Sequence, residues 1–273
     1  MRFGFIFTGS DPRMAVDWAQ QAEEAGWDAF FTWDSVWGTD PWVTLGACAV
    51  RTERVRLGTI ITPPSRRRPW KLAAEVATLD QLSNGRAILT VGLGALDTGF
   101  ESFGEATDRA VRAERLDESL AIINGLWQGQ PFSFSGKHYS LTPTTFPAPP
   151  PPVQQPRPPI WVVGAWPRPR SVDRALRWDG ILPNKMPAPG KFEAMTPQDV
   201  VDLKAYVAEH RNASTPFDLV IEGVTPGEAA DRGADQVRPL VEAGATWWLE
   251  SQWSTPELDR VLARLKQGPP RLG

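Results

Sequence analysis

Strand-like and helix-like segments alternate along almost the whole chain, and this alternation limits the fold more than any other feature. The strand-like segments are short and rich in aromatic and β-branched residues, whereas the segments between them repeat apolar residues with helical periodicity. A strict alternation of this kind predicts a parallel sheet whose strands are connected by helices. About eight such pairs in 273 residues favour a closed (β/α)8 TIM-like barrel, with residues 1–273 forming one domain.

The alternative is an open, doubly wound sheet. That fold needs a glycine-rich phosphate fingerprint after its first strand, and residues 8–12 (Thr-Gly-Ser-Asp-Pro) do not provide one. We therefore predict the barrel.

The predicted elements follow the alternation in chain order. We predict strands over residues 1–7, 27–33, 55–62, 87–91, 160–163, 180–183, 217–222 and 247–250. We predict helices over residues 12–26, 41–52, 69–82, 109–127, 169–178, 196–210, 235–243 and 255–266. Residues 128–159 interrupt the pattern with an insertion, a hairpin around Gly136 followed by a proline-rich run. Because Trp247 and Trp248 are adjacent in a strand, one should face the barrel interior and the other the helices.

Composition limits the partners and the location. The net charge of −3 gives no electrostatic case for nucleic acid binding. No run of about 18 apolar residues is present, so no membrane span is expected. The N-terminus has the pattern of a strand rather than of a signal peptide, and we expect a cytoplasmic protein.

The single cysteine, Cys48, excludes an intramolecular disulfide and should be a buried, unreactive thiol. His138 and His210 have no second ligand at metal-binding spacing, so we expect no metal site.

Ligands of such barrels bind at the carboxyl ends of the strands, and several aromatic residues follow predicted strands. The planar side chains of Trp33, Trp37 and Trp253 suit a pocket for a planar or small organic substrate, although they could equally pack beneath the loops. Asp34 lies between aromatic neighbours, where a carboxylate could serve in acid–base catalysis or could cap a turn.

Glycines and arginines in the same loops suggest cofactor contacts. Gly92 and Gly94 follow the fourth strand, where glycine allows either close approach of a ligand or a tight turn. Gly164 ends the fifth strand, and arginines at the start of the next helix could hold a phosphate or form a solvated basic turn. Residues 66–68 form a positive run near the mouth, which is either surface or part of the site.

These residues resemble the bacterial luciferase-like flavin-dependent oxidoreductases. The match extends over nearly the whole chain. It is strongest over residues 57–62, 68–69, 74–86 and 91–94, with further matches at 23–28, 103–104, 112–118, 158–161 and 174–180. The resemblance implies a TIM-like barrel that holds a tricyclic ring at the carboxyl ends of its strands.

The resemblance also implies positions for the cofactor. The ring should rest at the end of the third strand against Ile60, Ile61 and Thr62, with a non-proline cis peptide between Ile60 and Ile61, and near Asp34. The cofactor phosphate should lie at the end of the fifth strand. The cofactor-binding residues that we expect are Ile60, Ile61, Thr62, Gly92, Gly94, Gly164, Ala165, Trp166, Arg168 and Ser171.

The chain departs from its subfamilies at three positions. Many deazaflavin-dependent members carry Asp-His after the second strand, whereas this chain has Asp34-Ser35. Ala95 replaces an acidic residue of those members, and Leu93 replaces an arginine that helps luciferase to bind phosphate.

We predict an FMN-dependent monooxygenase that acts on a small organic substrate. The alternatives are a hydride-transfer enzyme that uses coenzyme F420 and a flavin-binding protein without catalysis. The resemblance further implies a homodimer and a separate flavin or F420 reductase as partner.

Overall fold

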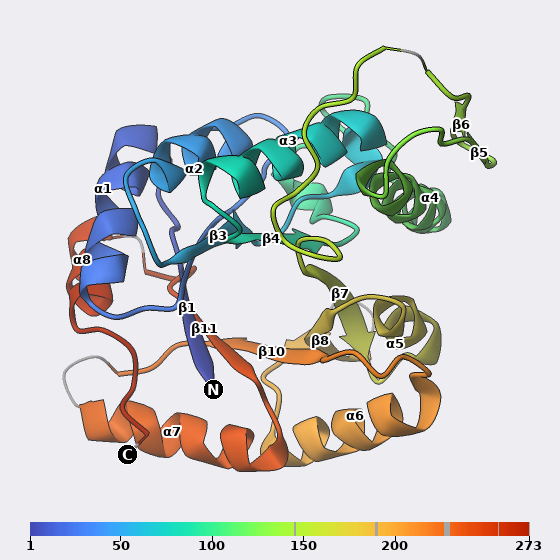
Figure 1. The fold of residues 1–273 in the computed structure, drawn as a ribbon. Coiled ribbons are helices and arrows are strands. Elements are labelled where there is room, and N and C mark those ends of the chain that lie inside the picture. Colours follow the sequence, from blue (N-terminus) through green and yellow to red (C-terminus); the bar gives the residue numbers. More distant parts are fainter. Residues whose placement is uncertain (145, 189–190, 227–229, 256, 273) are drawn as a thin grey trace.

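Eight parallel strands form a closed barrel within the described part of the chain, as the alternation predicted (Figure 1). The computed structural model describes residues 1–273 except 145, 189–190, 227–229, 256 and 273. The barrel strands are β1 (Arg2–Ile6), β2 (Ala29–Thr32), β3 (Arg56–Thr59), β4 (Ala87–Val91), β7 (Ile160–Trp166), β8 (Gly180–Ala188), β10 (Asp218–Gly223) and β11 (Trp247–Ser251). Each strand pairs in parallel with its neighbours, and the pairing of β8 with β10 closes the ring.

Helices surround the barrel, and several begin where the sequence places a cap and a proline. The helices are α1 (Pro12–Glu24), α2 (Pro41–Ala49), α3 (Pro69–Leu82), α4 (Arg109–Trp127), α5 (Pro169–Leu176), α6 (Pro197–His210), α7 (Ala230–Ala243) and α8 (Leu258–Lys266). Short 3-10 turns follow β3 (η1, Pro64–Arg66) and β4 (η2, Leu96–Thr98). The carboxylates of Asp11 and Asp40 cap α1 and α2, and Thr196 forms the predicted cap of α6.

Several elements differ from the prediction in their extent, and β7 and α7 are each longer than expected. We predicted that the sixth strand would end at Pro183. The strand instead continues to Ala188, and its outer part pairs antiparallel with β9 (Lys191–Glu193), which was not predicted. The third strand is regular only to Thr59, and Thr62 rejoins the sheet through a bridge to Val91.

The predicted insertion is present and extends away from the barrel. β5 (Phe134–Ser135) and β6 (Ser140–Leu141) form an antiparallel hairpin. Figure 1 shows this hairpin at the outer side of α4, well separated from the barrel strands. The proline-rich run then returns the chain to β7.

The apolar core has one layer inside the barrel and another between the strands and the helices. Trp247 belongs to the interior layer and Trp248 to the outer layer, as strand alternation predicted. The ring of Trp161 lies 5.1 Å from that of Trp247 and fills the barrel below the mouth. Cys48 is buried in the outer layer, where burial raises the pKa of its thiol to about 12 and makes it unreactive. No helix of the described residues is long and apolar enough to span a membrane.

Candidate functional site

A cavity of about 640 Å³ opens at the carboxyl ends of the barrel strands. The loops after β1, β2, β3, β4 and β11 form its walls. The lining residues are Thr8, Trp33, Asp34, Ile60, Ile61, Pro63, Gly94, Ala95, Asp97, Thr98, Trp253, Thr255 and Leu258. We call this space the mouth cavity. Its location is the one at which barrels of this kind bind their ligands.

Ile60 and Ile61 form an apolar wall of the mouth cavity, directly after β3. The peptide bond between them is cis, as expected from the resemblance. A Cβ atom on Gly92 would lie 2.6 Å from Cδ1 of Ile61, so glycine at position 92 makes room for this side chain. The function of Gly92 in the structure is therefore to allow Ile61 its position, and Gly92 itself does not line the cavity.

Two neighbouring residues fix the shape of this wall. Gly94 lines the cavity with a φ of +80°, and a Cβ atom there would lie 2.8 Å from Pro63. Thr62 is fully buried, and its hydroxyl lies 3.0 Å from that of Thr59. Thr62 therefore holds the backbone of the wall in place, and its side chain is not part of the lining.

Asp34 lies in the wall of the mouth cavity and is paired with two arginines. Its side chain is 3% exposed, with Arg66 Nη2 at 3.2 Å from one carboxylate oxygen and Arg67 Nε at 3.1 Å from the other. Arg66 also donates to the backbone oxygen of Asp34 at 2.7 Å. A buried carboxylate needs such partners because it has left water. The positive run at residues 66–68 thus contributes two side chains to the site.

Glu222 is a second carboxyl group near the mouth; it contacts the lining residue Trp253 but does not itself line the mouth cavity, and it was not predicted as a site residue. It lies one residue before the end of β10 and two residues after Val220, which belongs to the interior layer, so alternation directs Glu222 toward the barrel axis. Its carboxylate accepts a hydrogen bond from Nε1 of Trp253 at 2.5 Å. Burial raises the pKa of Glu222, although the hydrogen bond from Trp253 opposes this effect. The sequence signal was an acid that directly follows the apolar run of residues 219–221.

The three tryptophans that we proposed for the substrate pocket occupy different positions. Trp253 lines the mouth cavity, and its ring meets that of Trp33 edge-on at 6.5 Å. Trp33 separates the mouth cavity from a smaller cavity of about 180 Å³ between the loops after β1 and β2. Trp37 borders only this smaller cavity, is 83% exposed and stacks on Phe103.

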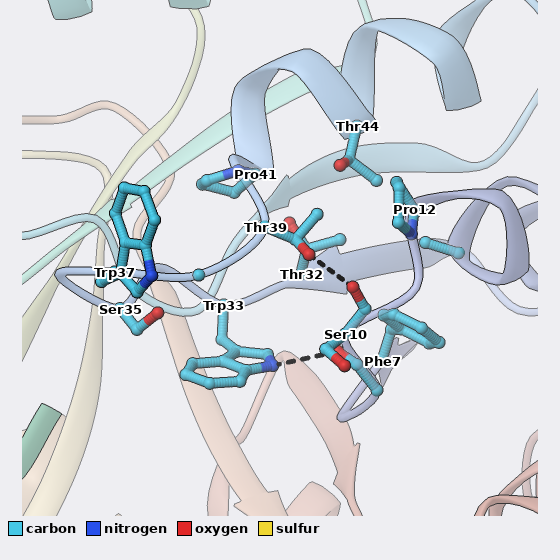
Figure 2. Close-up of a pocket in the computed structure, with 13 residues that line it drawn as sticks. Phe7, Ser10, Pro12, Thr32, Trp33, Ser35, Trp37, Thr39, Pro41 and Thr44 are labelled. Carbon is cyan, nitrogen blue, oxygen red and sulfur yellow. Dashed lines mark hydrogen bonds between the residues drawn. The ribbon is translucent and has the colours of Figure 1, made fainter.

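Figure 2 shows the smaller cavity and how its two loops are tied together. Nε1 of Trp33 donates to the carbonyl oxygen of Gly9 at 3.4 Å. The hydroxyl of Thr39 donates to the backbone carbonyl oxygen of Ser10. Ser35, which stands where many deazaflavin enzymes have histidine, borders this cavity and not the mouth cavity. The structure therefore separates Ser35 from Asp34, its neighbour in sequence.

The residues predicted to bind phosphate lie together in the turn from β7 to α5, apart from the mouth cavity. The N–H of Ala165 donates to Oγ of Ser171 at 2.9 Å, and the N–H of Arg168 donates to the oxygen of Ala165 at 2.9 Å. Gly164 is buried, and a Cβ atom there would lie 2.6 Å from Cδ1 of Ile181 on β8. Nε1 of Trp166 points to Asp199 at the start of α6. The strand β4 separates this turn from the wall after β3.

Known proteins match the chain in sequence and in fold. A glucose-6-phosphate dehydrogenase from Amycolatopsis mediterranei, named as F420-dependent, is 39% identical over 140 residues, which are 48% of this chain and 42% of the relative. The oxygenase component of a flavin-dependent trigonelline monooxygenase from Acinetobacter baylyi is 32% identical over 152 residues, 54% of this chain and 41% of the relative. The chain thus matches less than half the length of these curated relatives.

The structure of the F420-dependent tetrahydromethanopterin reductase of Methanopyrus kandleri matches 98% of both chains with a TM-score of 0.78, at 19% identity. This likeness supports the barrel fold. Residues 3–247 match the sequence profile described as luciferase-like monooxygenase. The chain therefore belongs to the luciferase-like monooxygenase family.

Proposed function

We propose that the chain is an oxidoreductase that binds the tricyclic ring of a flavin or deazaflavin in the mouth cavity. The observation that carries this proposal is the apolar wall of Ile60 and Ile61 at the carboxyl end of β3, beside Gly94. A flat aromatic ring needs an apolar face to rest on and a few polar groups at its edge. The hydroxyls of Thr8 and Thr90 are buried without a hydrogen-bond partner among the described residues, and they would supply polar groups of this kind.

For the phosphate of the cofactor we propose the turn from β7 to α5. Nε of Arg168 is buried there without a hydrogen-bond partner among the described residues. A guanidinium at the start of a helix suits an anion, because both the side chain and the helix dipole favour negative charge. The ring and phosphate positions lie on opposite sides of β4, as an extended cofactor requires.

The cofactor decides the chemistry. When bound, FMN supplies two-electron transfer and oxygen activation, whereas F420 supplies hydride transfer and reacts poorly with oxygen because its ring carries carbon at position five. We propose an FMN-dependent monooxygenase that acts on a small organic substrate. Supporting this version, Ala95 lines the mouth cavity where sugar-phosphate-oxidising F420 enzymes have an acid. Hydride transfer with F420 is the second candidate, and the relative from Amycolatopsis mediterranei favours it.

Glu222 is the group that we propose for proton transfer at the mouth. Among the described residues, no lysine, arginine or histidine nitrogen lies within 4.0 Å of its carboxylate. A carboxyl group whose raised pKa favours the neutral form can donate a proton under conditions where an ordinary glutamate has already lost it. Trp253, its hydrogen-bond partner, is itself a wall of the mouth cavity. Asp34 lines the same cavity and remains our candidate for a contact with substrate or ring.

The proposed partners follow from the family and its relatives. The protein from Acinetobacter baylyi is named as an oxygenase component, which supports a separate reductase as the source of reduced flavin. A homodimer is the assembly that the family resemblance suggests.

The decisive experiment is a titration of the apo-protein with FMN, FAD and F420, followed by tryptophan fluorescence. Three tryptophans border the two mouth-side cavities, so a bound ring should quench part of the signal. Ile61→Asp should abolish binding of the preferred cofactor, because a charge would stand against the apolar ring face. Val43→Asp, at a 75% exposed position on α2, is the matched control and should bind normally. Unchanged affinity of Ile61→Asp would exclude this ring position.

A second measurement separates the two candidate functions. Saturable binding of FMN together with substrate-dependent oxygen uptake would support the monooxygenase. Micromolar binding of F420 without any response to FMN would replace it with a hydride-transfer enzyme. Binding of either cofactor without turnover of any substrate would favour a binding protein.

A further inference from the structure

A second polar cavity lies outside the barrel, between η1, α4 and the hairpin. It has a volume of about 240 Å³ and shares no lining residue with the mouth cavity. The lining residues are Ser65, Arg66, Arg67, Arg68, Arg115, His138 and Tyr139. We call it the arginine cavity.

The hairpin forms a fixed roof over this cavity. The carboxylate of Glu118 on α4 accepts hydrogen bonds from the backbone N–H groups of Lys137 at 2.7 Å, of His138 at 3.0 Å and of Tyr139 at 3.0 Å. Nζ of Lys137 and Nε2 of His138 both contact Glu114, one turn earlier on the same helix. The roof is therefore bound to α4 at several points, which makes the cavity a built feature of the fold.

Positive charge in the arginine cavity exceeds the negative charge that balances it. Arg66 and Arg67 are paired with Asp34, and Arg67 also with Asp40 and Glu75. Arg68 and Arg115 lie more than 4.0 Å from every carboxylate in the described part of the chain. The guanidinium of Arg68 lies over the ring of Trp70, and that of Arg115 reaches only the carbonyl oxygen of Ser65 at 3.5 Å. Two guanidinium groups at this cavity thus have no counterion from the protein.

An unpartnered hydroxyl group provides an independent indication of a ligand. Ser65 is 7% exposed, and its Oγ has no hydrogen-bond partner among the residues described. Nε of Arg66 is also buried and has no hydrogen-bond partner among the residues described. Buried donors are nearly always satisfied in folded proteins, because an unmade hydrogen bond is unfavourable. Oxygen atoms of a ligand would satisfy both groups.

We propose that the arginine cavity is a second binding site, for a dianion of the phosphate type, separate from the mouth cavity. Guanidinium groups match the geometry of phosphate oxygens, and two unpaired guanidinium charges balance a dianion. The neutral hydroxyl of Ser65 adds one more donor. Because Arg66 lines this cavity and also pairs with Asp34, the anion would bind beside the ion pair that shapes the mouth.

The test is isothermal titration of the purified chain with inorganic phosphate, at constant ionic strength set by chloride. We expect saturable binding of one ion in the arginine cavity, which should persist in Arg168→Gln, a variant that weakens any ion bound at the turn from β7 to α5. Arg115→Gln should weaken it about tenfold, because it removes a charged donor, and Ser65→Ala about threefold, because it removes a neutral one. Arg109→Gln is the matched control, since Arg109 lies on the same helix, is exposed and does not line the cavity. It should leave the affinity unchanged.

Three results would overturn the proposal. The first is the absence of saturable heat. The second is an equal loss of affinity in Arg115→Gln and Arg109→Gln, which would indicate nonspecific attraction. The third is a loss in Arg168→Gln while Arg115→Gln binds normally, which would place the ion at the turn from β7 to α5. Thermal unfolding without phosphate checks that each variant folds, and Arg68→Gln, at an exposed position, replaces Arg115→Gln if that variant does not.

Discussion

Asp34 and Glu222 are two acids at the same barrel mouth, and the protein stabilises them in opposite ways. They belong to the ends of β2 and β10, which are separated by β11 and β1. Asp34 is enclosed by two arginines at 3.2 Å and 3.1 Å. Glu222 has a neutral partner, the indole of Trp253, and burial raises its pKa.

The difference in their partners indicates which acid suits a structural role and which suits proton transfer. A carboxylate within a double ion pair holds loops together, because removing it would leave buried guanidinium groups without a counterion. A carboxyl group that burial shifts toward its neutral form can exchange a proton near the working pH. We therefore assign the architecture of the mouth mainly to Asp34 and proton transfer to Glu222.

Glu222→Gln should have the largest effect, a fall in kcat of about 100- to 1000-fold, because the amide keeps the shape but cannot transfer a proton. The measurement is turnover in whichever assay the parent supports, oxygen uptake with reduced FMN or reduction of F420. Asp97→Asn is the control, since Asp97 also lines the mouth cavity but is exposed, and its kcat should stay within about threefold of the parent value. A similar kcat for Glu222→Gln would remove Glu222 from the chemistry.

Asp34→Asn should lower the free energy of unfolding by about 3 kcal/mol, because Arg66, whose side chain is 7% exposed, loses its charged partner. Urea unfolding measures this loss. Glu257→Gln removes one member of an exposed pair with Arg260 and should leave stability nearly unchanged. If Asp34→Asn were as stable as the parent but lost turnover and its pH dependence, the roles of the two acids would be reversed.

The sequence allowed the barrel to be predicted because its signals are local. Helical periodicity depends only on residues that are close together in the sequence. The same is true of the cap at Thr196 and of the prolines that begin helices. The insertion at 128–159 followed from the break in the alternation and from its own hairpin and proline signals. The cis peptide between Ile60 and Ile61 followed from a resemblance over contiguous blocks. β9 escaped prediction because its pairing with β8 depends on a strand that continues past a proline.

The site was harder to predict because its contacts join distant residues. The sequence suggested Asp34 and, separately, the arginine run, but only the fold brings Arg66 to a carboxylate 32 residues away. Glu222 and Trp253 are 31 residues apart, and no local pattern links them. Trp33, Trp37 and Trp253 shared one signal, yet the structure distributes them between two cavities.

The pH dependence of stability should distinguish the parent from Glu222→Gln. Because the folded state raises the pKa of Glu222, the neutral form contributes stability that is fully present below the unfolded pKa of about 4.3. This contribution is lost as the pH rises through the folded pKa, with a slope of at most about 1.4 kcal/mol per pH unit. Urea unfolding from pH 4 to 8 should show this decline in the parent relative to the variant. Parallel curves for the two proteins would contradict a shifted glutamate.

Trp253→Phe should have the smallest effect, a shift of the pH profile with little change in maximal rate. The indole N–H donates to the carboxylate at 2.5 Å and lowers the pKa of Glu222 against the larger effect of burial. Phenylalanine keeps an apolar ring but has no donor, so the pKa of Glu222 should rise further. The alkaline limb of kcat, where a proton donor becomes ionised, should then move to higher pH by the same amount. Trp37→Phe, at a position 83% exposed and outside the mouth cavity, should leave the limb in place. A shift to lower pH in Trp253→Phe would contradict this effect of the indole, because it would mean that the indole raises the pKa of Glu222 by stabilising the neutral acid.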